Sequence, residues 1–330
     1  MTETILNIEG LKTYFFTEAG IVKAVDNISF NLKKGESLGL VGESGSGKTV
    51  TALSVLRIVP KPGRTIDGKV EFNGDDLFKK TEKEMQRIRG SEIAIIFQDP
   101  SSSLNPVYNV ETQLRDVIMA HQTVSKTEAR KKVIELLKVV GIPEAETRMR
   151  EYPHQFSGGM KQRVAIARAL ACEPTLLFAD EPTTNLDVTI QVQVLNLLND
   201  LKKKFGMTLV IITHDMGIIA EMTTRIVVLY AGRVCEIAKT YDLFERPRHP
   251  YTEALLAAVP RLDMRKTLRI IPGNIPNLIE PPSGCRFHPR CDYAEQICKE
   301  RVPVLEKIEQ GHFVACHKWQ NIRLKGERSH

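Results

Sequence analysis

The sequence lacks any apolar run of about 18 residues, which is the length that a membrane-spanning helix needs. Its first residues, Met-Thr-Glu-Thr, are not a basic stretch followed by an apolar one, so no signal peptide is predicted and a reducing cytoplasm is expected. A hydrophobic share of 42% with 26% charged residues is ordinary for a globular protein and excludes a chain that is disordered throughout. At roughly 150 residues per domain, the 330 residues favour two domains, or one large domain with an appendage.

Cysteine is absent from the first 106 residues, and four of the six cysteines fall in the last 46: Cys285, Cys291, Cys298 and Cys316. In a reducing compartment, clustered thiols indicate metal or redox chemistry more often than structural disulfides. Charge is uneven in the same way. From Arg261 onward there are 13 Lys and Arg against 8 Asp and Glu, so this segment carries +5 of the total net charge of +6.

Short β-branched runs alternate with longer stretches of helical periodicity, which predicts an α/β fold. The predicted strands are Ile5–Ile8, Val25–Leu32, Ser37–Val41, Lys69–Phe72, Ile93–Phe97, Leu176–Ala179, Thr208–Ile212 and Arg225–Tyr230. The predicted helices are Lys48–Ile58, Glu111–Ala120, Lys126–Val140, Met160–Ala171 and Val188–Phe205. The alternation from Leu176 to Tyr230 is typical of βαβ units with a parallel sheet, and residues 100–172 read as a helical insert.

After Arg246 the sequence becomes rich in proline, and only one helix is predicted there, near Tyr251–Ala258. A domain boundary is therefore predicted between 240 and 260, separating residues 1–250 from an appendage of residues 251–330. So small a piece has little room for a core and usually needs a metal, disulfides or docking for its stability.

A glycine-rich motif, Gly42-Glu-Ser-Gly-Ser-Gly-Lys-Thr49, matches the phosphate-binding loop pattern between an apolar strand and a helix. Glycines let successive N–H groups turn towards one anion, and the helix N-terminus adds partial positive charge. Lys48 is expected to reach the β- and γ-phosphates, and the Thr49 hydroxyl to bind Mg²⁺. The nucleotide-binding residues predicted here are Gly42, Glu43, Ser44, Gly45, Ser46, Gly47, Lys48, Thr49 and Val50.

A buried-strand pattern, Thr175-Leu-Leu-Phe-Ala, ends in the acids Asp180 and Glu181. A carboxylate at the end of a parallel strand can hold the water shell of Mg²⁺, which suits Asp180. Glu181 can polarise a water for attack on the γ-phosphate.

Between these motifs, Phe156-Ser-Gly-Gly-Met160 resembles the signature motif of ATP-binding-cassette (ABC) ATPases. Gln98 resembles the Q-loop glutamine, Asn185-Leu-Asp187 the D-loop, and His214 the switch histidine of that family. Phe15 stands where the family places an aromatic ring that stacks on adenine, with Tyr14 and Phe16 as rivals.

The resemblance covers residues 1 to about 240 and implies a P-loop domain with a mixed sheet, an antiparallel β part and a helical insert. It implies head-to-tail pairing of two such domains, so that Ser157, Gly158, Gly159 and Met160 bind ATP held by the partner. Glu181 would be the general base, His214 would hold the γ-phosphate, and Thr49, Gln98 and Asp180 would serve Mg²⁺. Two positions depart from the family pattern: Val50, often Thr, and Asn185, often Ala.

The wording "FQDPSSSLNP" (97–106), "DEPTTNLDVTIQVQVL" (180–195) and "RPRHPYTEALLAAVP" (246–260) resembles ATPase subunits of dipeptide and oligopeptide ABC importers. Nickel importers share much of it and are the alternative, and a soluble ABC ATPase without a transport role is a weaker one. The resemblance implies a second ATPase subunit, expected to be a paralogue, two integral-membrane permeases and an extracytoplasmic binding protein. The chain would be peripheral at the cytoplasmic face of the membrane, with no nucleic-acid partner.

The gaps between Cys285, Cys291, Cys298 and Cys316 are wider than in the usual zinc pairs. Within the importer subfamily they resemble an element associated with a [4Fe–4S] cluster, with zinc, and free or disulfide-bonded thiols, as alternatives. His288, His312 and His317 are the alternative ligands of this site, but they are expected to be hydrogen-bonding residues near it. Cys172 and Cys235 are expected to be small core residues.

Overall fold

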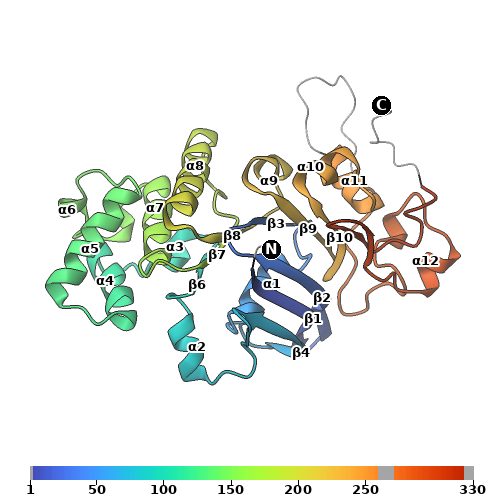
Figure 1. The fold of residues 1–330 in the computed structure, drawn as a ribbon, viewed down its shortest axis with the longest axis horizontal. Coiled ribbons are helices and arrows are strands. Elements are labelled where there is room, and N and C mark those ends of the chain that lie inside the picture. The colour runs from blue at the N-terminus through green and yellow to red at the C-terminus, as the bar shows by residue number, and fades with distance from the viewer. Residues whose placement is uncertain (1–2, 259–270, 323–330) are drawn as a thin grey trace. The chain divides into compact units, whose positions relative to one another are not determined.

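A computed structural model describes residues 3–258 and 271–322 (Figure 1). The chain divides into two compact units, one formed by Met1–Lys79 with Ile211–His330 and the other by Lys80–Val210. The strand β8 (Thr208–Thr213) runs from the second unit into the first. Within the described residues, no helix has both the length and the apolar character that a membrane crossing requires.

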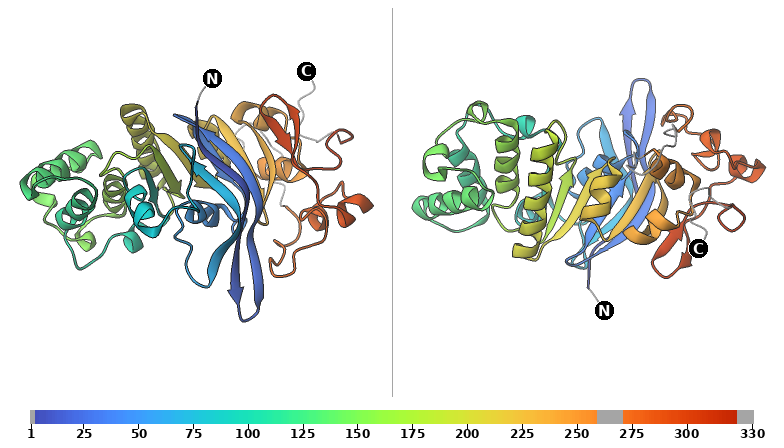
Figure 2. Two further views of the ribbon diagram at one scale, coloured as in Figure 1. Left: turned by 60° about the horizontal axis from the view of Figure 1, so that its bottom comes forward. Right: turned by 90° about the horizontal axis from the view of Figure 1, so that it is seen from above.

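The first unit contains an antiparallel sheet of order β2-β1-β4-β5, whose long β1–β2 hairpin stands out in Figure 2. Its strands are β1 (Thr4–Thr17), β2 (Gly20–Lys33), β4 (Gly63–Phe72) and β5 (Asp75–Asp76). Three of them run well beyond the apolar segments predicted from sequence. Register shifts, such as the one between Ile8 and Leu11, keep the pairing while they break the apolar alternation that the prediction relied on.

A second group of strands in this unit has the order β11-β12-β10-β9-β3. Here β3 (Ser37–Val41) and β9 (Arg225–Tyr230) pair in parallel and are almost wholly buried. The antiparallel strands β10 (Arg233–Lys239), β12 (His312–Val314) and β11 (Glu306–Glu309) extend the group. Among the described residues up to 258, the helices of this unit are α1 (Lys48–Val55), α9 (Met216–Met222), α10 (Thr240–Glu245) and α11 (Pro250–Ala257).

The second unit pairs β6 (Ile93–Ile96) with β7 (Leu176–Asp180) in parallel, beside a helical cluster. Its helices are α2 (Glu82–Ile88), α3 (Pro100–Ser103), α4 (Val110–His121), α5 (Lys126–Val139), α6 (Ala145–Arg148), α7 (Gly158–Ala169) and α8 (Val188–Phe205), with a 3₁₀ turn at Pro153–Gln155. The helices α3 to α7 lie within residues 100–172, the segment for which a helical insert was predicted.

Local sequence explains where the insert helices begin and which faces they bury. Asn109 caps α4, and Ser125 forms a capping box with Glu128 at the start of α5. The buried residues of the two helices recur at helical spacing: Val110, Leu114 and Ile118 on α4, and Ala129, Val133 and Leu137 on α5.

The C-terminal element, residues 271–322, contains a 3₁₀ turn (His288–Arg290), α12 (Gln296–Glu300) and the strands β11 and β12. These strands were not predicted, because they are only four and three residues long. The element falls in the same compact unit as the β core. It is attached by strand pairing of β12 with β10 and by buried polar contacts, among them His312 Nε2 to Glu236 Oε1 at 2.7 Å.

Asp26 on β2 is a junction of such contacts. Its carboxylate accepts hydrogen bonds from the Tyr14 hydroxyl at 2.7 Å, from Arg233 at 2.9 Å and from Arg286 of the C-terminal element. Burial alone would raise the pKa of Asp26, but the bonds from Tyr14 and Arg233 and the charge of Arg286 lower it below its ordinary value. The carboxylate therefore holds the β core and the C-terminal element together as an anion.

Asp26→Asn should lower the free energy of unfolding by about 3 kcal/mol, because two arginines lose a buried counter-charge. Since the folded pKa lies below the unfolded value of about 4, the stabilisation by Asp26 is complete above that pH and is lost as pH falls through the folded pKa. Urea unfolding of both proteins between pH 7 and pH 2 measures this. Asp67→Asn, which removes the exposed partner of Lys12, is the matched control and should change little. Equal stability of Asp26→Asn and the parent at pH 7 would contradict the assignment.

Candidate active site

The predicted phosphate loop lies between the buried strand β3 and helix α1. Gly47 is the N-cap residue of α1, with φ of 100°, and no side chain caps this helix. The first N–H groups of a helix have no partner within the helix, so this end of α1 suits an anion. Lys48 is 5% exposed, and its Nζ donates to the carbonyl oxygens of Gly42 at 2.8 Å and of Glu43 at 3.0 Å. The Lys48 side chain thus links the end of the phosphate loop to its first two residues.

Two glycines of the loop stand where no side chain fits. A Cβ on Gly42 would lie 2.1 Å from the Leu229 carbonyl oxygen, and one on Gly47 would lie 2.5 Å from that of Ala24. The buried Ser46 hydroxyl has no hydrogen-bond partner among the described residues. A glycine cradle with a spare hydroxyl suits an incoming phosphate, because it supplies close backbone approach and an unused donor.

Glu181 is held in an unusual conformation after β7. Its φ of 44° is in the left-handed region, and its Oε2 accepts from Gln98 Nε2 at 2.8 Å and from Thr184 Oγ1 at 2.9 Å. Backbone strain at a polar residue is typical of functional sites. Of the predicted residues, the structure therefore brings Gln98 and Glu181 together. Asp180, at the end of β7, is 3% exposed.

The signature residues form the start of α7. The Ser157 hydroxyl caps this helix by accepting from the Met160 N–H at 3.3 Å, and Gly158 is exposed. A Cβ on Gly159 would lie 2.7 Å from the side chain of Ile190 on α8, so glycine permits close packing there. The arrangement presents an open, uncharged helix N-terminus, a geometry suited to an anion.

The D-loop residues have local structural tasks. Asp187 caps α8 by accepting from the Ile190 N–H at 3.0 Å. Asn185 has φ of 64°, a left-handed conformation that asparagine tolerates better than alanine. The departure from the family pattern at Asn185 thus has a backbone reason.

The three aromatic candidates for adenine stacking differ in their contacts. Tyr14 is tied to Asp26, and burial together with that bond raises its pKa to about 12. The guanidinium carbon of Arg64 lies over the Phe16 ring, 4.1 Å from the centroid of that ring. Phe15 packs against Gly63, where a Cβ would lie 2.6 Å from the ring.

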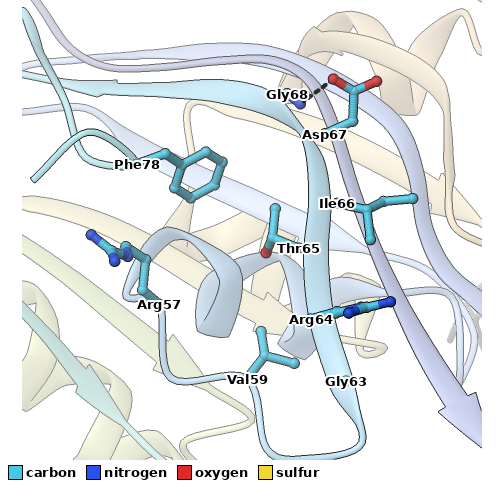
Figure 3. A pocket seen from close by; sticks show the side chains of 9 residues that line it. All are labelled: Arg57, Val59, Gly63, Arg64, Thr65, Ile66, Asp67, Gly68 and Phe78. Carbon is cyan, nitrogen blue, oxygen red and sulfur yellow. Dashed lines mark hydrogen bonds between the residues drawn. The ribbon is translucent and has the colours of Figure 1, made fainter. Parts of the chain in front are cut away.

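A pocket along β4, drawn in Figure 3, lies next to this aromatic segment. Gly63 and Arg64 line it, together with Arg57 and Phe78, but none of the predicted nucleotide-binding residues does. It is therefore separate from the phosphate loop.

The predicted residues are distributed over both units. Phe15, the phosphate loop and His214 belong to the first, and Gln98, Asp180, Glu181, the signature and Asp187 to the second. His214 is exposed and follows β8, and the next residue, Asp215, caps α9.

Cys285, Cys291, Cys298 and Cys316 line one small cavity of the C-terminal element. All six cysteines are free. Burial raises the pKa of Cys291 to about 11 and that of Cys316 to about 12. Within residues 3–258 and 271–322, no group of three His, Cys, Asp or Glu side chains is placed to hold a metal ion. The structure thus gathers the four thiols, but it does not show the predicted metal centre.

The histidines near this cavity have hydrogen-bonding tasks, as predicted. His288 Nδ1 lies 2.9 Å from the Cys285 carbonyl oxygen, and His317 Nε2 lies 2.9 Å from that of Arg301. His312 pairs with Glu236. Cys235 is buried, as expected of a small core residue, whereas Cys172 is half-buried.

Comparison with known proteins follows this geometry. Residues 25–184 match the family "ABC transporter", and residues 235–298 match "Oligopeptide/dipeptide transporter, C-terminal region". The chain is 47% identical over 314 residues to the dipeptide transport ATP-binding protein DppD of Escherichia coli (strain K12), covering 95% of this chain and 96% of that protein. This chain belongs to the ABC transporter ATPases. It is accordingly an enzyme that hydrolyses ATP.

Other relatives agree with this family. The ABC ATPase is 46% identical over 319 residues to the oligopeptide transport ATP-binding protein AppD of Bacillus subtilis (strain 168), covering 96% of this chain and 97% of that protein. Among solved structures it resembles the dimeric ATP-binding cassette MJ0796 bound to ADP and Pi, with a TM-score of 0.64 and 28% identity over 72% of this chain and 99% of that one.

Three residues at these sites were not predicted from sequence. Thr184 supports the Glu181 carboxylate, and its position in "DEPTT", three residues after the acid, is the signal that could have found it. Tyr251 and Arg290 contact Glu43 of the phosphate loop from more than 200 positions away. No local pattern marks such a contact.

Gly47→Ala should destabilise the ABC ATPase more than Gly45→Ala. Both glycines have positive φ, which costs an alanine about 1–2 kcal/mol, but only at Gly47 does a backbone oxygen occupy the Cβ position. The added collision should cost about 1–3 kcal/mol more. Thermal and urea unfolding of both variants measure the difference, and equal stabilities would show that the cradle at Gly47 yields to a side chain.

Proposed function

We propose that this ABC ATPase energises the import of dipeptides or oligopeptides. The match of residues 235–298 to the C-terminal region of peptide transporters supports peptide cargo. So do the names of relatives that are aligned with nearly the whole chain, DppD and AppD among them. These findings favour peptides over nickel.

Glu181 is the proposed general base for ATP hydrolysis, and the observation that carries this role is its restrained carboxylate. Gln98 and Thr184 donate to one oxygen, Oε2, and the backbone is held at positive φ. The Glu181 carboxylate can accept a proton from a water that attacks the γ-phosphate. Gln98 would link this base to Mg²⁺ and the nucleotide.

The phosphate loop is the proposed site for the nucleotide of the same chain. Lys48 would exchange its bonds to the Gly42 and Glu43 carbonyls for the β- and γ-phosphates, and the free Ser46 hydroxyl would gain a partner. Thr49 and Asp180 would hold Mg²⁺, which neutralises phosphate charge when bound. Phe15 would stack on adenine, and His214 would hold the γ-phosphate.

A second ATPase subunit completes the proposed site. Ser157, Gly158, Gly159 and Met160 would bind ATP on that partner, and the dimeric state of the related MJ0796 supports such pairing. Two permeases and an extracytoplasmic binding protein are the further partners, with this chain at the cytoplasmic face of the membrane. The partner ATPase is proposed to be a paralogue.

Glu181→Gln should lower ATP turnover by about 100-fold or more while ATP binding is retained, because the amide keeps the shape but accepts no proton. ATPase assays and size-exclusion chromatography with ATP measure turnover and a trapped dimer. Glu173→Gln, at an exposed glutamate of the same unit, is the control. Normal turnover by Glu181→Gln would refute the assigned base.

Residues 251–330 are proposed as a C-terminal extension of the nucleotide-binding domain, with Cys285, Cys291, Cys298 and Cys316 holding a [4Fe–4S] cluster. The observation that supports the cluster is the meeting of four free thiols from a 32-residue span around one cavity. Four thiolates are the donor set of such a cluster. Bound there, it would cross-link an element in which few apolar side chains are buried.

Anaerobically purified protein should contain iron and acid-labile sulfide in a ratio near one, and Cys298→Ser should lose both. Cys172→Ser, outside the cavity, should retain them. Metal analysis and visible absorption measure the content. Zinc without iron in the parent protein would overturn the cluster in favour of the zinc alternative.

A further inference from the structure

The C-terminal element reaches the phosphate loop through one arginine. Arg290 Nη1 donates to Glu43 Oε2 at 2.7 Å, and Nη2 donates to Glu43 Oε1 at 3.1 Å, so guanidinium and carboxylate form a two-pronged pair. The side chain of Arg290 is only 5% exposed and that of Glu43 is 23% exposed. The pair is thus shielded from solvent and lies at the second residue of the loop.

Arg290 is itself fixed in place. Its Nε donates to the Pro272 carbonyl oxygen at 2.7 Å, and Nη1 also donates to the Tyr230 hydroxyl at 3.2 Å. Burial alone would lower the pKa of Arg290, but its hydrogen bonds with Glu43 and Tyr230 raise it above its usual value. The guanidinium is therefore a permanent positive charge in a set position.

The backbone of Glu43 is held from the same side. Its N–H donates to the Tyr251 hydroxyl at 2.8 Å, and Tyr251 is fully buried against Tyr230 and Phe287, with ring centroids 4.6 and 5.3 Å away. Both the carboxylate and the amide of Glu43 are thus bonded to residues outside the loop. A loop whose second residue is fixed in this way keeps its shape before a ligand arrives.

Charge gives this contact a consequence for ligand binding. A carboxylate in a phosphate-binding loop repels a polyanion, and the repulsion is strong where water is partly excluded. Arg290 cancels that charge at a distance of one hydrogen bond. We propose that Arg290 of the C-terminal element is a positioning residue for nucleotide binding, which neutralises Glu43 and holds the phosphate loop ready for the triphosphate. The inference rests on the proposed nucleotide site at residues 42–49.

Arg290→Ala should weaken MgATP binding to the full-length chain by at least about fivefold, the lower range of coupling between linked sites. MgADP, which carries less negative charge, should lose less. Replacing Glu43 as well, in the double variant Arg290→Ala with Glu43→Gln, should restore MgATP affinity to within about twofold of the parent, because the unpaired carboxylate is gone. Isothermal titration calorimetry measures each dissociation constant, and thermal unfolding is recorded in parallel.

The controls separate this role from a structural one. Arg301→Ala removes an exposed arginine of the same element and should leave MgATP affinity unchanged. Arg290→Lys keeps the charge but not the fork and should fall between parent and Arg290→Ala; it also serves if the alanine variant does not fold. Lys48→Ala tests the nucleotide site itself.

Two results would overturn the inference. One is a lower unfolding temperature of Arg290→Ala, or of Arg290→Lys, with unchanged MgATP affinity. The other is an affinity loss that is equal for MgATP and MgADP and is not restored by Glu43→Gln. If Lys48→Ala binds MgATP as the parent does, the proposed nucleotide site is wrong. If Lys48→Ala loses MgATP affinity but Arg290→Ala keeps it, the nucleotide site stands and only the role of Arg290 is rejected.

Discussion

The structure depends first on a steric constraint at the phosphate loop. At Gly42 and Gly47 a side chain would collide with the carbonyl oxygens of Leu229 and Ala24, so the loop lies directly against its neighbouring strands. Gly232, just after β9, donates its N–H to the Ser46 carbonyl oxygen at 2.9 Å and fixes the loop from another side. Close backbone packing against these strands therefore fixes the path of the loop.

The C-terminal element is joined to this framework by buried polar contacts, as well as by packing of Phe287 against Tyr230 and Tyr251. Arg286 binds Asp26 and the Ala231 carbonyl, Arg290 binds Glu43, and His312 binds the fully buried Glu236. Buried arginine–carboxylate pairs, such as those of Arg286 and Arg290, contribute little net stability but are costly to break, so they specify one docking arrangement. Arg290 contacts Glu43, which belongs to the phosphate loop, and Arg286 contacts Ala231, which precedes the Gly232 bonded to that loop. These two contacts link the C-terminal element to the nucleotide site.

Sequence reasoning succeeded where a local pattern carried the information. Helix α4 followed from the spacing of residues such as Leu114 and Ile118, and the parallel strands β3 and β9 from their continuous apolar runs. It failed at β11 and β12, because strands of four and three residues are too short for a pattern of their own, and they form by pairing β12 with β10 and β11 with β12. The hydrogen bonds from Thr184 to Glu181 and from Arg290 to Glu43 depend on side-chain positions that the spacing of residues in the sequence does not reveal.

The sequence by itself determined the family and the kind of chemistry, because the glycines, lysine and hydroxyl of residues 42–49 and the acids after Ala179 are contiguous motifs. It also showed four cysteines in one terminal stretch. Only the tertiary structure decided that these thiols meet at one cavity and that Arg290 reaches the phosphate loop. The physical reason is distance along the chain. A motif is fixed by neighbours in sequence, whereas a pair such as Arg290 and Glu43 exists only when two remote segments are packed against each other.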